Sequence, residues 1–248
     1  MFFTINKKKL LVIFCMVFSL FIFIIHFIFN KNIININTKT IEVSSLPYSN
    51  KTIILDAGHG NPDGGATGNN GKILESDLNL EIILKLQKLL ELSNINVILT
   101  RSDENGIYSE DANSIREKKI SDMENRANLS ENTYADLFLS IHMNSLNNSS
   151  VKGFQVFYSN KNTNSKSCAN FINENLTYSL LNFNNNKKVK EIKDIYLAKK
   201  ILHPFVLIEC GFLSNADEAY LLTTDEYQNK LTWGIYTGII DYFSNIDN

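Results

Sequence analysis

The sequence contains four histidines, and two of them occupy positions from which an imidazole could bind a metal ion. His59 ends the apolar run TIILDAGH and His142 ends the run DLFLSIH, so each follows a predicted buried strand. The other two, His26 and His203, lie in an apolar N-terminal run and in a predicted loop before a proline. Because parallel strands end at the same edge of a sheet, we expect His59 and His142 to face a common site.

Two glutamates could complete such a site. Glu209 lies inside the apolar run FVLIECGF, where a buried carboxylate requires a metal, a cation or a hydrogen-bond network. Glu75 follows His59 by 16 residues and immediately precedes a predicted helix, and the glycine-rich loop between them could fold it back. Two imidazoles and one carboxylate, with one position open for water, form the usual ligand set of catalytic zinc. The second carboxylate would then act as general base on the metal-bound water.

Each of these residues also has a purely structural interpretation. A histidine at the end of a strand commonly forms a structural hydrogen bond, and Glu75 could be an acid favoured at a helix start by the helix dipole. The sequence allows two roles for Asp56: it could support a histidine through a hydrogen bond, or it could simply terminate the strand. A buried Glu209 is the hardest to explain without a site. The convergence of all four residues on one edge therefore favours the metal-centre interpretation.

Apolar strands alternate with amphipathic helices from residue 51 onward. The alternation predicts a mostly parallel sheet with helices on both faces, in the α/β class. Ligands of such sheets bind at the carboxyl ends of the strands. The predicted strands are 51–60, 96–101, 136–145, 153–159 and 205–212, and the predicted helices are 76–93, 114–132, 165–181 and 223–243.

The N-terminus predicts a membrane segment. Lysines 7–9 precede an apolar run over 10–29 that is long enough to span a bilayer and is not followed by a small-residue cleavage site. We therefore expect residues 1–9 in the cytoplasm, an uncleaved anchor over 10–29 in preference to a removed signal segment, a linker over 30–50 and a catalytic domain over 51–245. That domain is expected outside the cytoplasmic membrane, with a cleaved secreted form as the alternative.

Charge and cysteine usage exclude several functional classes. Three of the 24 basic residues precede the apolar run, which leaves 21 basic and 26 acidic residues in the rest, a net charge of −5. This balance predicts no binding of nucleic acid. The three cysteines form neither a Cys-x-x-Cys motif nor a disulfide framework. We expect Cys210, inside an apolar strand, to be a small buried residue and not a nucleophile.

Four sequence blocks point to one family. They are ILDAGHGNPDGGATG, ESDLNL, RANL followed by ADLFLSIHMNS, and PFVLIECGFLSN, and they extend over about residues 51–243. Together they resemble the zinc-dependent N-acetylmuramoyl-L-alanine amidase family, of the amidase type 3 class. The resemblance implies a doubly wound α/β fold, zinc ligands His59, Glu75 and His142, and Glu209 as catalytic base. It also implies hydrolysis of the amide between N-acetylmuramic acid and the stem-peptide L-alanine of peptidoglycan.

Within this family the chain looks most like the germination-specific amidases of endospore formers, and this resemblance implies a role in the formation of muramic-δ-lactam in the spore cortex. The place of action that it implies is the cell wall or the forespore intermembrane space. The chain carries no wall-binding repeat, and the interval between His142 and Glu209 holds no long helical insertion of the kind that plugs the site in cell-division members. The expected partners are peptidoglycan, the membrane through the N-terminal helix, and an exported activator protein.

Two other functions stay open. One is a catalytically silent zinc-binding or wall-binding module, which would not require Glu209. The other is a zinc peptidase that acts on the stem peptide, because the four site residues by themselves do not distinguish that substrate from the muramyl amide.

Overall fold

The computed structural model describes residues 16, 18–20, 22, 48–181 and 188–246. The chain divides into two compact units, Met1–Ser44 and Ser45–Asn248. The predicted anchor over 10–29 and linker over 30–50 lie almost entirely outside the described residues. Within the described residues, no helix is both long enough and apolar enough to cross a membrane.

The second unit is built on a six-stranded sheet with the strand order β4–β1–β5–β8–β6–β7. The first four strands are mutually parallel, whereas β6 runs antiparallel to β8 and parallel to β7. The mostly parallel sheet predicted from the sequence is therefore confirmed. The strands are β1 (Thr52–Ala57), β4 (Asn96–Leu99), β5 (Leu137–Asn144), β6 (Gln155–Tyr158), β7 (Lys190–Glu191) and β8 (Phe205–Phe212).

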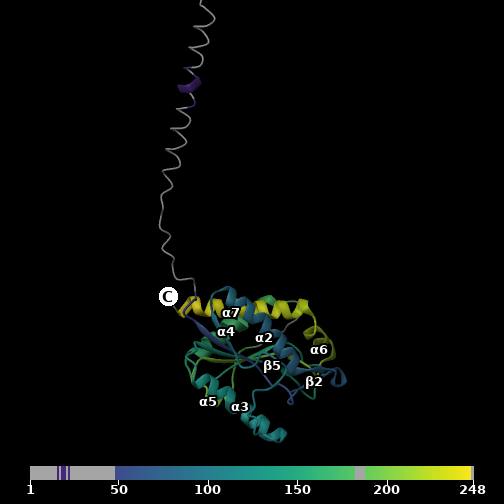
Figure 1. The fold of residues 1–248 in the computed structure, drawn as a ribbon. Coiled ribbons are helices and arrows are strands. Elements are labelled where there is room, and N and C mark those ends of the chain that lie inside the picture. Colours follow the sequence, from purple (N-terminus) through teal and green to yellow (C-terminus); the bar gives the residue numbers. More distant parts are fainter. Residues whose placement is uncertain (1–15, 17, 21, 23–47, 182–187, 247–248) are drawn as a thin grey trace, which may run out of the picture. The chain divides into compact units, whose positions relative to one another are not determined.

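Helices cover both faces of this sheet (Figure 1). On one face lie α2 (Glu75–Leu92), α4 (Asn164–Ser179) and α7 (Asp225–Ile246), and on the other lie α3 (Ile115–Glu131) and α5 (Tyr196–Lys200). Short elements that the apolar pattern did not predict complete the unit: β2 (Thr67–Gly68), the 3-10 turn η1 (Asn69–Gly71), β3 (Ile73–Leu74) and α6 (Ala216–Leu222).

Alternation along β1 divides its side chains between two cores. Ile53 and Leu55 belong to the larger apolar cluster with α2, α4 and α7, whereas Ile54 packs in the smaller cluster beside α3 and α5. Because side chains alternate along a strand, Asp56 points to the same face as Ile54. A carboxylate is thus directed into the core under α3, where it needs a partner.

The strand order places a crevice at the carboxyl end of β1. This strand is flanked by β4, which follows it in the chain, and by β5, which lies on its other side. A reversal of strand order of this kind opens a crevice beyond the carboxyl ends of the two strands. The loop after β1 and the end of β5 both lead into it, and β8 lies next to β5.

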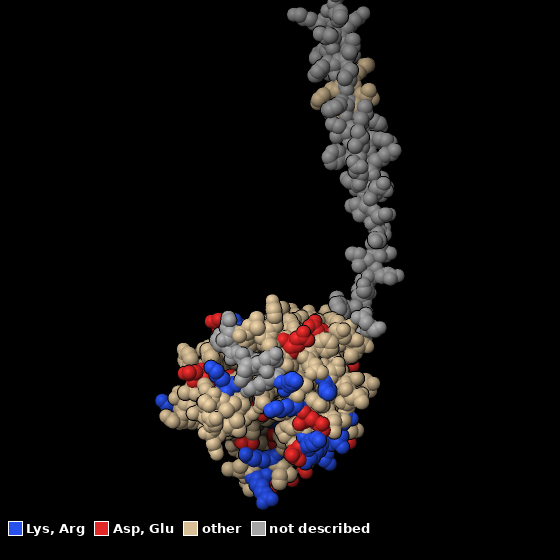
Figure 2. Space-filling model, turned by 180° about the vertical axis from the view of Figure 1, so that it is seen from behind, with Lys and Arg blue, Asp and Glu red and all other residues tan. Residues whose placement is uncertain are grey.

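Charged side chains are distributed without segregation on the face shown in Figure 2. Acidic and basic residues are interspersed over the part of that face that the described residues form.

Candidate metal centre and active site

His59 is held in a tight loop immediately after β1. Its backbone has φ 62°, and the neighbouring Gly60 pairs with Asp63 in an isolated bridge. This turn brings Oδ2 of Asp63 to 3.0 Å from Nδ1 of His59. The carboxylate accepts the Nδ1 proton, so Nε2 is left as the atom that can bind a metal. Nε2 lies 3.2 Å from Oε1 of Glu75.

Glu75 begins α2 and is buried, with both carboxylate oxygens fixed by backbone amides. Oε2 accepts a hydrogen bond of 2.7 Å from the amide of Ala66, and Oε1 accepts one of 3.0 Å from the amide of Met143. Nδ1 of His142, at the end of β5, lies 2.9 Å from the same Oε1. The loop from His59 to Glu75 therefore folds the carboxylate back between the two histidines.

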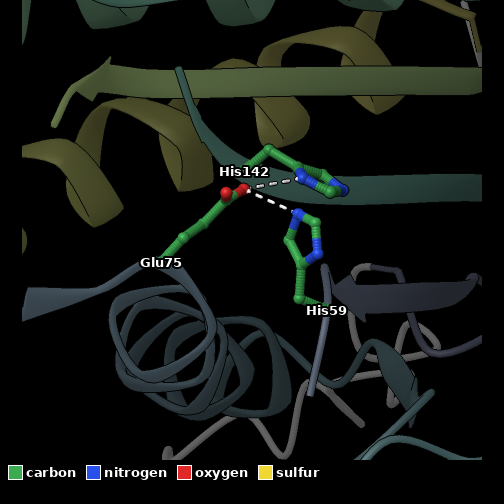
Figure 3. A group of neighbouring side chains, drawn as sticks. All are labelled: His59, Glu75 and His142. Atoms are coloured by element: carbon green, nitrogen blue, oxygen red, sulfur yellow. Dashed lines mark hydrogen bonds and ion pairs between the residues drawn. The ribbon is translucent and has the colours of Figure 1, made fainter. Parts of the chain in front are cut away.

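The three side chains converge on one point (Figure 3). The possible ligand atoms of His59, Glu75 and His142 all lie within 4.8 Å of one another, and the two imidazole centroids are 5.0 Å apart. Two imidazoles and a carboxylate are the donor set of catalytic zinc sites, so the residues fit that ion.

The carboxylate of Glu75 and the imidazole of His59 shift each other's pKa. Burial by itself would raise the pKa of Glu75, but the neighbouring His142 and His59 outweigh it and hold that pKa well below its ordinary value. Burial lowers the pKa of His59, and the carboxylates of Glu75 and Asp63 outweigh this and raise it to about 9. The carboxylate of Glu75 is therefore charged at neutral pH.

Glu209 lies beside this cluster, on the adjacent strand. It is the register partner of His142 across the β5–β8 pair, so both side chains leave the sheet on the same face. Its Oε2 atom is buried and forms no hydrogen bond within the described residues. Burial, reinforced by Glu75, raises the pKa of Glu209 to about 7 despite the opposing effect of His142. A carboxyl group with such a pKa is suited to accept and return a proton near neutral pH.

Comparison with known proteins identifies the family. The model of the N-acetylmuramoyl-L-alanine amidase family matches residues 53–241. The chain belongs to this family. It is 39% identical over 200 residues to the germination-specific N-acetylmuramoyl-L-alanine amidase of Bacillus subtilis (strain 168), with 81% of this chain and 83% of the relative covered.

Two solved structures have the same fold. The amidase CwlD of Clostridioides difficile, solved in complex with the GerS lipoprotein, is 44% identical with a TM-score of 0.76, over 79% of this chain and 99% of that one. The catalytic domain of the amidase CwlV from Bacillus (Paenibacillus) polymyxa var. colistinus is 30% identical with a TM-score of 0.67, over 78% and 98%. The resemblance drawn from the sequence blocks is confirmed, and the reaction that follows is hydrolysis of the muramyl–L-alanine amide.

Arg126, a residue of α3, fixes the loop that carries His59 in this amidase. This residue is fully buried and pairs with Asp56 and with Asp122, the latter at 2.7 Å. It also donates hydrogen bonds to the carbonyl oxygens of Ala57 (2.8 Å) and His59 (2.5 Å). The guanidinium thus joins the end of β1 to α3 and holds the backbone of the first histidine.

The ion pair with Arg126 distinguishes between the two roles that the sequence allowed for Asp56. Its carboxylate accepts hydrogen bonds from Arg126, from Thr100 (2.9 Å) and from Ser140 (2.5 Å), and within the described residues it forms no hydrogen bond to either site histidine. Asp56 therefore supports His59 through Arg126 and the backbone. Burial would raise the pKa of Asp56, but Arg126 keeps it below its ordinary value.

A second buried arginine fixes the same segment from another direction. Arg101 donates hydrogen bonds to the carbonyl oxygens of Ala57 (2.9 Å), Gly58 (3.1 Å) and Ser76 (2.7 Å). It connects the loop after β1 to the first turn of α2, where Glu75 begins. One side chain thus links the loop that carries His59 to the first turn of α2, which carries Glu75.

Two glycines allow the groups of the site to approach one another. A Cβ atom on Gly58 would lie 2.3 Å from the imidazole of His142. A Cβ atom on Gly65, which has φ 69°, would lie 2.5 Å from Oε2 of Glu75. Side chains at these positions would displace two of the three candidate ligands, because real Cβ atoms do not approach so closely.

The structure separates the remaining candidates from the site. His203 donates a hydrogen bond of 3.0 Å from Nε2 to the carbonyl oxygen of Ser130, away from the metal cluster. Cys210 is fully buried, and burial raises the pKa of its thiol well above the usual range. His26 lies outside the described residues.

Sequence reasoning did not assign Asp63, Arg101 or Arg126. Asp63 lies four residues after His59 within the block HGNPDGG, and this spacing was the available signal. Arg126 stood in the RANL block, but its contact with β1 depends on the tertiary packing of α3.

Proposed function

We propose that this amidase holds a zinc ion through His59, Glu75 and His142 and uses Glu209 as its general base. A bound zinc ion would act as a Lewis acid and lower the pKa of a bound water molecule. Glu209 would accept the proton of the attacking water and return it to the nitrogen of the leaving L-alanine. Asp63 would keep His59 in the tautomer that presents Nε2.

The observation that carries this proposal is the buried Oε2 of Glu209, which has no hydrogen-bond partner within the described residues and lies next to three converging side chains that could hold a metal ion. A carboxylate that is buried without a hydrogen bond costs stability, and structural roles rarely retain one. A proton-transfer role explains its presence, whereas a silent zinc-binding module would not need it.

Substitution of each proposed ligand tests the metal site. We expect His59→Ala, Glu75→Ala and His142→Ala each to lose bound zinc and to lower hydrolysis at least about 10²-fold, because two protein ligands hold the ion weakly. Zinc content by atomic emission and peptidoglycan hydrolysis are the measurements. His203→Ala, which changes a histidine outside the cluster, should keep both. A ligand variant with full zinc and full activity would remove that residue from the site.

We propose that this amidase acts on the peptidoglycan of the spore cortex, outside the cytoplasmic membrane. The relative in Bacillus subtilis is a germination-specific amidase, and the lysines and apolar run over 7–29 have the pattern of an export signal or anchor. We propose the domain arrangement predicted from the sequence, with the catalytic domain beginning near residue 51. Spores that lack the protein should lack muramic-δ-lactam, and an unchanged lactam content would contradict the cortex role.

We also propose that an exported partner protein activates this amidase. The similar amidase CwlD of Clostridioides difficile is found in complex with a lipoprotein. A partner that tightens zinc binding must itself be bound more tightly when zinc is present, because such coupling is reciprocal. The purified chain with excess zinc should be weakly active on cortex peptidoglycan and stimulated by a co-purifying protein. Full activity that is unchanged by extract from sporulating cells would contradict this proposal.

A further inference from the structure

A pocket opens beside the metal cluster on the face covered by α3 and α5. It has a volume of about 190 Å³, and both His59 and His142 line it at one end. Its walls are mainly apolar and include Met123, Leu197 and Leu207. Because side chains alternate along strands, the register partner of His142, Glu209, is directed to the same face.

Two lysines of α3 line the same pocket. Lys119 places Nζ 2.9 Å from Oδ1 of Asp63, and more than half of its side chain is exposed to solvent. Lys118 places Nζ 4.5 Å from the ring centroid of Tyr108, which also lines the pocket. Within the described residues, Lys118 forms no ion pair with a carboxylate. Lys118 is less exposed than Lys119, so the apolar walls reduce the screening of its charge by water and strengthen its attraction for an anion.

The acids near these lysines are already engaged. Asp122 pairs with Arg126 and accepts a hydrogen bond of 2.6 Å from the amide of Ile107. Asp63 is shared between His59 and Lys119. Asp63 and Asp122 line the pocket together with the two lysines, and among these four side chains Lys118 is the one without an ion pair within the described residues.

We propose that Lys118 and Lys119 form a subsite for a carboxylate of the stem peptide, next to the bond that is cut. This inference rests on the proposed function, because it takes the scissile amide to lie at the metal cluster. Lys119 lies one side chain away from His59, because Asp63 contacts both of them, at 2.9 Å and 3.0 Å. An extended peptide advances roughly 3.5 Å per residue, so the residue after L-alanine is within reach of this lysine. In peptidoglycan that residue is D-glutamate with a free α-carboxylate or its amidated form, D-isoglutamine. The subsite selects the free carboxylate.

Binding of two matched peptides to the zinc-loaded full chain tests the subsite. Both are tripeptides that begin at L-alanine, and they differ only in whether the second residue is γ-linked D-glutamate or D-isoglutamine. We expect the dissociation constant to be roughly 3- to 10-fold lower for the carboxylate form, the range for a partly exposed charge-assisted contact. Lys118→Met and Lys119→Met should each reduce this preference, whereas Lys88→Met, an exposed lysine on α2, should keep it.

The ratio between the two peptides isolates the lysine–carboxylate contact from other effects of the substitutions. Lys119→Met also removes a partner of Asp63, but a disturbance of His59 would change the binding of both peptides alike. Equal binding of the two peptides by the parent protein, no binding of either, or a full preference retained in both lysine variants would overturn the proposal. A protein that shows the preference but releases no stem peptide from peptidoglycan would contradict the proposed function and leave the subsite intact.

Discussion

Replacing Glu209 with glutamine should lower the rate of peptidoglycan hydrolysis by about 10²- to 10⁴-fold, the range for loss of a general acid–base group, while the zinc content stays near that of the parent. Glutamine keeps the size of the side chain but cannot accept a proton from water. Its oxygen is not needed for coordination, because three other side chains converge on the metal position.

The zinc content of the purified variant and its rate of peptidoglycan hydrolysis are the two measurements that test this prediction. Glu174→Gln, which makes the same change at an exposed position of α4, is the matched control and should leave activity and zinc unchanged. Loss of zinc from Glu209→Gln would identify Glu209 as a ligand and contradict its role as base.

Replacing Arg126 with methionine should lower the free energy of unfolding by about 3–5 kcal/mol, the cost of removing one partner from a buried ion pair. The variant leaves the carboxylates of Asp56 and Asp122 without their guanidinium in a buried environment. It also removes the donors to the carbonyl oxygens of Ala57 and His59. Zinc affinity should therefore fall together with stability.

Urea unfolding of the zinc-free protein gives the first quantity, and zinc titration of the folded variant gives the second. Arg116→Met, an exposed arginine on the same helix, should change stability by no more than about 0.5 kcal/mol. A change below about 1 kcal/mol for Arg126→Met would show that the buried pair contributes little.

The sequence predicted the strand ends well because apolar runs of buried strands are local signals. His59, His142 and Glu209 each follow or interrupt such a run, and the parallel order of β1, β5 and β8 brings them to one edge. The folding of Glu75 back to this edge was predicted only as a possibility of the glycine-rich loop. The structure shows the amides of Ala66 and Met143 that fix it.

The groups that support the site were harder to predict, because their partners are distant in the sequence. The buried face of α3 carries Asp122, Arg126 and Ser130, so the side that packs on the sheet is polar and gives no apolar stripe. Arg126 reaches Asp56 across 70 residues. The antiparallel direction of β6 and the two-residue strands β2 and β3 also depend on pairing that an apolar pattern does not contain.

Mass spectrometry of cortex peptidoglycan digested by the zinc-loaded protein tests the central claim most directly. The account predicts release of free stem peptides whose amino terminus is L-alanine, together with glycan strands in which N-acetylmuramic acid carries a free lactyl carboxylate. Shortened peptides that remain attached to muramic acid would instead show a stem-peptide peptidase, and digestion without any new product would show a silent zinc-binding module. Either of these results would contradict the account.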